Sequence, residues 1–385
     1  MINVIKREFE ILKNNSFIFF ILFFAPIIFC CIIVGTFFTG SLNNLPISVL
    51  DEDNSAISRQ IQRAVNSVPS AEIKYTVSNL TEGQRLLTEG KAYALIVIPK
   101  NFSRDLQRMS VPKIVLYYNN QTILIGGVIS KDVLTVLYTT AAKIDAVTRI
   151  KKGLPPKIVL NKVNLIRVDE HIKSNPYMNY SYFLTFAAIA HVFQIFAVFI
   201  SIWTFGNEFK KGTTKEWMSV ANDNIFNAVL GKLLFYSSVI TILMLAVYFG
   251  YILFYGAPFE GNVLFFAFSS FIFVMAYQLM GMMFVSILSN YRLAMSCGAF
   301  YTSLAFTFAG MTFPVMAMPL IGKIYSSFLP IRPFVNVVID QTLKGIPPIY
   351  DIGYLLWISA LGLMGFLSIY LLKKHVYRED LWYQI

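Results

Sequence analysis

The sequence predicts an α-helical membrane protein with six transmembrane helices and an extracytoplasmic α/β domain inserted between the first and second of them. Of the 385 residues, 56% are hydrophobic and only 14% are charged, whereas soluble globular domains are nearer a quarter charged. Six long apolar runs divide the chain. A polar, turn-rich stretch at 45–176 is large enough to fold as its own domain.

The amino terminus combines an amphipathic stretch with a first membrane span. Residues 1–16 place apolar side chains at helical spacing between charged ones, which predicts a helix on the cytoplasmic membrane surface; they are Ile2, Ile5, Phe9 and Leu12. The first transmembrane helix follows at 17–39. It contains 22 uncharged residues, Phe17 to Phe38, about 33 Å of helix. No small-x-small cleavage pattern follows, so we expect this span to be retained.

The insert, 45–176, alternates strand and helix patterns, which predicts a small α/β domain. We expect strands at 46–50, 72–77, 93–98, 113–118 and 157–168, and helices at 55–65, 79–89, 101–109 and 121–152. Its place after a cytoplasmic amino terminus and one span puts it outside the cytoplasm. Asp51 and Asp53 resemble catalytic or metal-binding carboxylates, but no histidine or further acid supports them. We therefore predict turn and capping roles.

The second to sixth spans are expected within 181–372, at 181–205, 225–255, 263–288, 293–310 and 352–372. Basic residues gather in the short segments that this topology places inside, which are 206–222, the turn at Arg292 and the tail at 373–385. Both termini are therefore predicted to be cytoplasmic. The same pattern explains the net charge of +11 as membrane topology rather than nucleic-acid binding.

A charged segment, 206–222, lies between the second and third apolar runs and carries Lys210, Lys211 and Lys215. Its lysines predict a cytoplasmic position. The mixture of acids, bases and a large aromatic is typical of a surface that docks on a partner. A solvated interfacial turn, with Trp217 reaching toward the membrane boundary, is the alternative.

Between the fifth and sixth spans, residues 311–350 are apolar but repeatedly broken by proline. Such a backbone would leave hydrogen-bonding groups unpaired in lipid, so we expect short half-helices packed on protein at the outer surface. The residues singled out there are Phe313, Pro314, Pro319, Pro330 and Arg332. Arg332, Asp340 and Lys344 would either guide an exiting substrate or anchor the interface.

Three polar residues within the spans, His191, Gln194 and Gln278, either line a translocation path or join helices by hydrogen bonds. We favour helix joining because no intramembrane carboxylate is expected, an absence that also argues against a proton-driven antiporter. No phosphate-binding loop is present, since Gly231-Lys232 lacks the required preceding glycine and following Ser or Thr. With three histidines, no metal site is expected and no catalytic residues are identified.

The charged segment resembles a known motif. Glu208-x-x-x-Gly212-Thr213-x-x-Glu216 is similar to the loop between the second and third spans of ABC exporter permeases of the second type, where it is the coupling helix that touches the ATPase. The resemblance implies a set of ATPase-coupling residues: Glu208, Phe209, Lys210, Lys211, Gly212, Thr213, Glu216 and Trp217. FAGMTFPVMAMP and LPIRPFVNVVIDQTLKG resemble the outer half-helices of that family. Residues 45–118 resemble the extracytoplasmic domain of the branch that works with periplasmic adaptors.

The resemblance implies a multi-pass permease subunit in the bacterial cytoplasmic (inner) membrane that exports an amphipathic or apolar cargo such as a drug or lipid. It would pair with a second copy or a paralogue and, in the adaptor branch, with a periplasmic adaptor and an outer-membrane channel. ATP and Mg would bind a separate ABC ATPase subunit, with no cofactor on this chain. The alternative is a membrane-anchored receptor whose outside domain binds a partner without transport.

Overall fold

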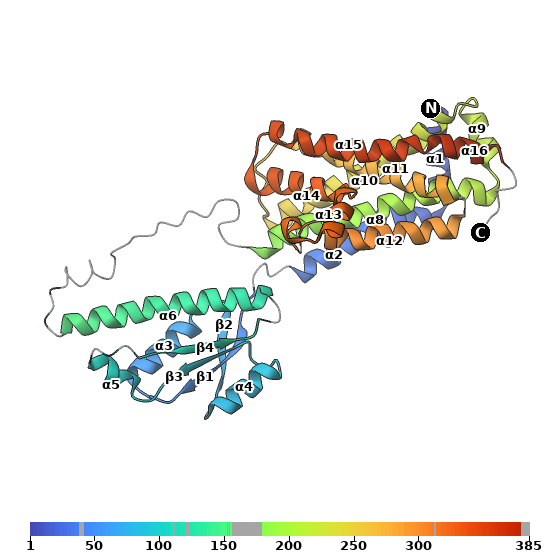
Figure 1. Cartoon of the computed structure of the whole chain (residues 1–385). Helices are drawn as coiled ribbons and strands as arrows, with labels where there is room; N and C mark the ends of the chain where they lie inside the picture. Colours follow the sequence, from blue (N-terminus) through green and yellow to red (C-terminus); the bar gives the residue numbers. More distant parts are fainter. Residues whose placement is uncertain are drawn as a thin grey trace. The chain divides into compact units, whose positions relative to one another are not determined.

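The computed structural model describes residues 1–37, 42–108, 110, 112–120, 123–151, 153, 155, 179–288, 290–311 and 313–378. The chain divides into two compact units, one formed by Met1–Gly40 with Ile172–Ile385 and the other by Ser41–His171 (Figure 1). We call them unit 1 and unit 2. The strand predicted at 157–168 lies outside the described residues.

Unit 2 is built on a four-stranded sheet of order β2-β1-β3-β4, with β1 parallel to β2 and β3, and β4 antiparallel to β3. The strands are β1 (Leu45–Asp51), β2 (Ala71–Thr76), β3 (Ala94–Ile98) and β4 (Val115–Tyr118). The helices are α3 (Ala56–Asn66), α4 (Leu80–Thr88), α5 (Phe102–Gln107) and α6 (Ile123–Lys151). Each of these corresponds to a strand or helix expected from the sequence.

The two faces of this sheet have separate cores because side chains alternate along each strand. Ile47, Val49 and Ile96 are buried in one cluster with residues of α3 and α6. Leu50 and Leu95 pack on the other face with residues of α4. Helices therefore cover both faces, as the apolar sequence ALIVI of β3 requires.

The acidic turn after β1 is structural. Asp51 Oδ1 accepts hydrogen bonds from the backbone N–H groups of Asp53 and Asn54, at 3.0 and 2.9 Å. Asp53 Oδ2 accepts from the Ser103 N–H at 3.1 Å, and Ser55 caps α3 in a capping box with Ser58. The described residues include no group of three or more His, Cys, Asp or Glu that could hold a metal ion. The predicted turn and capping roles are those observed.

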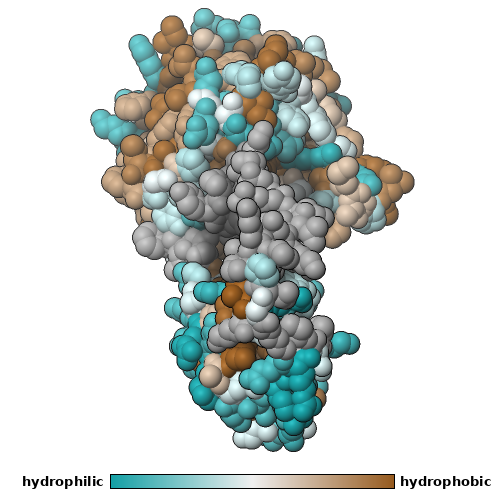
Figure 2. Space-filling model, turned by 90° about the vertical axis from the view of Figure 1, so that its left-hand side faces the viewer, coloured by the Kyte–Doolittle hydropathy of each residue, from teal (hydrophilic) through white to brown (hydrophobic). Residues whose placement is uncertain are grey.

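Unit 1 is a helical bundle centred on α8 (Tyr180–Lys211), which contacts helices before and after it in the chain. The other long helices are α2 (Ser16–Thr36), α10 (Ile225–Tyr255), α11 (Val263–Leu288), α12 (Tyr291–Phe308) and α15 (Ile352–Leu367). The short helices α1 (Ile2–Asn14), α9 (Thr214–Val220) and α16 (Ile369–Val376) lie at one end of this bundle (Figure 1). Hydrophobic residues cover much of the visible surface of unit 1 (Figure 2), as expected for helices that face lipid.

Among the described residues, five helices are long and apolar enough to cross a membrane, at 16–36, 181–211, 225–255, 263–288 and 348–376. The fifth span predicted from the sequence, 293–310, corresponds to α12 and is not among them. This helix has only 18 residues and begins with Tyr291 and Arg292, which lower its mean hydropathy. It packs on α8 and α11, and the count of six spans stays a prediction.

The proline-rich segment folds as short helices. They are η1 (Val315–Ala317), α13 (Leu320–Ser327), α14 (Ile331–Ile339), the π-helical turn η2 (Asp340–Lys344) and η3 (Pro348–Asp351). Pro319 and Pro330 stand immediately before α13 and α14, where their missing N–H costs nothing. In α14, Phe334 stacks on Phe273 with ring centroids 4.0 Å apart. Packing on protein is thus observed for α14.

The packing of η1 and α13 on protein is partial. In α13, Ser326 is buried and its Oγ donates to the Phe308 carbonyl at 2.7 Å, but other side chains of the two helices are exposed. Met316 is 91% exposed and Ile321 is 81% exposed, and Phe313 is also exposed. These short helices satisfy much of their backbone hydrogen bonding internally. Their apolar side chains can therefore face lipid without the unpaired groups that motivated the expectation.

The packing of α1 on α10 leads to a first testable prediction. A Cβ atom at Gly231 would lie 2.7 Å from Val4 Cβ, whereas a Cβ at Gly250 on the same helix meets nothing within 4 Å. Gly231→Val should therefore displace α1 and destabilise the protein by about 2 kcal/mol. Gly250→Val is the matched control and should change the thermal unfolding midpoint little. Equal midpoints for the two variants would contradict this packing.

Candidate coupling site

The charged segment 206–222 begins as part of α8. This helix contains no proline and continues through Gly206 to Lys211. Gly212 ends it in the left-handed region, with φ 68°, and the Thr213 N–H then donates to the Glu208 carbonyl at 3.0 Å. The short helix α9 follows and connects α8 to α10 along the chain. The helix thus extends six residues beyond Phe205, where the sequence predicts the second span to end.

Glu208 points inward and is only 4% exposed, although the sequence placed it on a docking surface. Its Oε1 accepts from Arg7 Nη1 and Lys232 Nζ, both at 2.6 Å. Its Oε2 accepts from Arg7 Nη2 at 3.1 Å and from Thr213 Oγ1 at 2.5 Å. The paired contacts with Arg7 have the fork geometry that makes arginine–carboxylate pairs strong.

Lys232 lies in α10 and is 1% exposed. Its Nζ is 3.0 Å from Glu8 Oε1 and donates to the Thr204 carbonyl at 3.0 Å as well as to Glu208. Glu8, on α1, is equally buried and accepts from the Tyr236 hydroxyl at 3.2 Å. A buried lysine and two buried carboxylates thus meet between α1, α8 and α10.

Arg7 completes what we call the buried ion cluster, namely Arg7, Glu8, Glu208 and Lys232. Its Nη1 is 3.1 Å from Glu8 Oε1, and its Nε donates to Glu216 Oε1 on α9 at 3.3 Å. Burial lowers the pKa of Arg7, but the hydrogen bond and charge of Glu208 outweigh burial and raise it, so Arg7 remains cationic. Two positive and two negative charges balance within the cluster.

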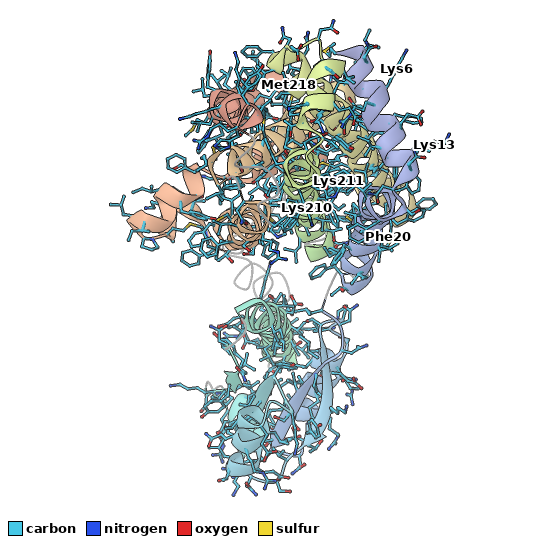
Figure 3. The ribbon with its side chains drawn as sticks, turned by 90° about the vertical axis from the view of Figure 1, so that its right-hand side faces the viewer. Lys6, Lys13, Phe20, Lys210, Lys211 and Met218 are labelled. Atoms are coloured by element: carbon cyan, nitrogen blue, oxygen red, sulfur yellow. The ribbon has the colours of Figure 1, made fainter. Side chains whose placement is uncertain are left out.

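The predicted coupling residues divide into buried and exposed sets. Trp217 is fully buried, where its Nε1 donates to the Ala228 carbonyl at 3.3 Å and its ring lies 5.0 Å from Lys232 Nζ. The alternative in which Trp217 reaches toward the membrane boundary is therefore wrong. Phe209 is also buried, whereas Lys210, Lys211 and Glu216 are exposed and Gly212 and Thr213 are half-buried. Figure 3 labels Lys210 and Lys211 on α8, Met218 on α9, and Lys6 and Lys13 on α1.

The polar residues within the spans join helices. Gln194 Nε2 lies 2.7 Å from His191 Nδ1 and 3.4 Å from the Thr302 carbonyl on α12. Ser237 Oγ on α10 donates to Gln278 Oε1 on α11 at 3.0 Å. Gln194 Oε1 and Gln278 Nε2 are buried without a hydrogen-bond partner. Their role in a translocation path stays a prediction.

The charged residues between the fifth and sixth predicted spans differ in their contacts. Arg332 lies over the Trp357 ring, with Cζ 4.9 Å from its centroid. Asp340 is buried and accepts from Lys344 Nζ at 2.5 Å, and the fully buried Asp351 accepts from Gln341 Nε2 at 2.7 Å. Both carboxylates lie outside the spans that the sequence predicts. The expected absence of a carboxylate within those spans, and the argument against proton-driven transport that rests on it, stay predictions.

Sequence reasoning missed Arg7, Glu8, Lys232 and Tyr236. Lys232 carried a signal, because an ionisable residue inside an apolar run is a functional candidate by default. On α1, Val4, Glu8 and Leu12 are buried against protein, whereas Ile2 and Phe9 are exposed. The position of this helix on the membrane surface stays a prediction. The buried face follows i, i+4, i+8 spacing with a charge at its centre, so a count of apolar residues alone does not find it.

A double-mutant cycle tests whether the buried ion cluster acts as a unit. Glu208→Gln leaves excess positive charge and Lys232→Met leaves excess negative charge, so each should cost about 3–5 kcal/mol of unfolding free energy. In the double variant, the remaining charges of Arg7 and Glu8 still cancel. Its loss of unfolding free energy should be smaller than the sum of the losses of the two single variants by about 1–3 kcal/mol, measured by SDS unfolding in mixed micelles.

The exposed Lys210 provides the matched control for this cycle. Lys210→Met removes a positive charge from the same end of α8 and should cost less than about 0.5 kcal/mol, as surface substitutions generally do. Strict additivity of Glu208→Gln and Lys232→Met would show that the two charges do not depend on one another.

Comparison with known proteins places the chain in a family. The family model described as ABC-2 family transporter protein matches residues 16–372, which include α8, α9 and α10. Comparison with curated proteins gives no match. The matched range covers nearly all of unit 1 and the whole of unit 2. The chain therefore belongs to the ABC-2 family of transporter membrane proteins and is an ABC permease.

Proposed function

We propose that this permease is the membrane subunit of an ATP-driven exporter and that α9 is the element through which an ABC ATPase subunit drives it. The carrying observation is the buried ion cluster. Arg7 joins Glu216 on the short helix α9 to Glu208 on α8, and Glu208 in turn accepts from Lys232 on α10. A short helix that has an exposed face and is attached in this way could pass a displacement to the bundle.

The two sets of predicted coupling residues would have different tasks. Exposed Lys210, Lys211 and Glu216 would contact the ATPase, together with the exposed Lys215. Buried Trp217 and Thr214 would transmit the motion, since Thr214 Oγ1 donates to the Glu208 carbonyl at 3.2 Å and Trp217 bonds to α10. Separating charges in a buried cluster is costly, so the helices would move together.

The cargo would be an amphipathic or apolar molecule, and a second copy or a paralogue would complete the path. The end of unit 1 that carries α1, α9 and α16 (Figure 1) is rich in lysine, which supports a cytoplasmic position for it. Both termini would then lie on the cytoplasmic side of the bacterial cytoplasmic membrane. Unit 2 would then lie outside, where a periplasmic adaptor and an outer-membrane channel could be engaged. ATP and Mg would be bound by the ATPase.

Co-purification tests the docking surface. Lys210→Glu with Lys211→Glu reverses two exposed charges, so an ATPase that is recovered with the wild-type chain should be lost while the thermal unfolding midpoint is unchanged. Lys323→Glu is the control, because Lys323 is also exposed but lies on α13. It should leave recovery of the ATPase intact.

Two results would overturn the proposal. The first is that no nucleotide-binding subunit co-purifies with the wild-type chain in any detergent that preserves its fold. The second is equal recovery by the wild-type chain and the double reversal. The first result would favour the alternative of a receptor whose unit 2 binds a partner without transport.

A further inference from the structure

Unit 2 contains a cavity that the coupling function does not use. It has a volume of about 620 Å³ and lies between α3, α5, α6 and β4. Four of its lining residues, Ile61, Phe102, Leu137 and Ile144, belong to the buried core of the unit. The cavity therefore reaches the hydrophobic core of unit 2.

The lining of this cavity is apolar along most of its length. Ile61 comes from α3, Phe102 and Leu106 from α5, and Leu137, Ala141 and Ile144 from α6. The α6 residues recur at three- and four-residue intervals, so they share one face of that helix. From Leu134 to Ile144 this face extends about 15 Å.

Polar groups from α6 line the same cavity within a single helical turn. Asp145, Thr148 and Arg149 follow directly after Ile144. Arg149 Nε donates to both carboxylate oxygens of Asp145, at 2.9 and 2.8 Å. The pair is partly exposed and presents a positive and a negative group side by side.

We propose that this cavity binds a single-chain zwitterionic amphiphile, with its hydrocarbon chain against Leu137, Ala141 and Ile144 and its head group at Asp145 and Arg149. The volume lies within the range of small-molecule sites, which are mostly apolar with a few placed polar groups. A phosphate beside Arg149 and an ammonium beside Asp145 would match the ion pair. A fatty-acid carboxylate would instead meet the charge of Asp145. This inference does not depend on the coupling role of α9.

Photolabelling of the full chain in phosphatidylcholine nanodiscs tests the site. The probe is lysophosphatidylethanolamine with a diazirine near the end of its chain, and labelled peptides are identified by mass spectrometry. Labelling should fall on residues that line the cavity. Ala141→Trp should reduce it about tenfold because the indole fills the space needed by the chain.

Thr139→Trp is the matched control, since Thr139 is exposed on the same helix and does not line the cavity. It should label like the wild-type chain. Asp145→Asn tests the head group: it should weaken labelling by the lysophospholipid and strengthen labelling by a diazirine-bearing palmitic acid. Labelling confined to unit 1, or equal labelling of the two tryptophan variants, would overturn the proposal.

Discussion

Unit 1 depends on the neutralisation of charge at its α9 end. Arg7, Glu8, Glu208 and Lys232 come from three helices, and all but Arg7 are almost inaccessible to solvent. A single unpaired charge at such a position would cost several kcal/mol. Each helix is therefore held in place by charges on the others. Stability alone does not require this, because well-packed apolar residues often serve as well, and the proposed coupling function would use the cluster to keep these helices moving together.

Local backbone features support the cluster. Gly212 ends α8 in a left-handed conformation and turns the chain so that Thr213 bonds back to Glu208. Gly231 lets α1 approach α10 closely, which places Glu8 beside Lys232. Trp217 closes the other side of the cluster over the Lys232 ammonium group. The exposed lysines of 206–222 thus lie outside a cluster whose charged groups are buried.

Local patterns predicted much of the fold. Unbroken apolar runs gave the limits of α10 and α11, and turn residues gave the strands and helices of unit 2. The site was only half predicted. Arg7 and Glu208 are 201 residues apart, and nothing in either local sequence identifies its partner. Glu208 and Trp217 were placed on a surface because charged segments are usually solvated. Glu208 is buried by contacts with Arg7 on α1 and Lys232 on α10, and the local sequence of 206–222 identifies neither partner.

Hydrogen exchange of the full chain in nanodiscs, comparing the wild type with Glu208→Gln, tests most directly whether the buried ion cluster links these helices. The amides of α1 and α9 should gain exchange together in the variant, although neither helix is altered in sequence. Increased exchange confined to the end of α8, with α1 and α9 as protected as in the wild type, would contradict the account.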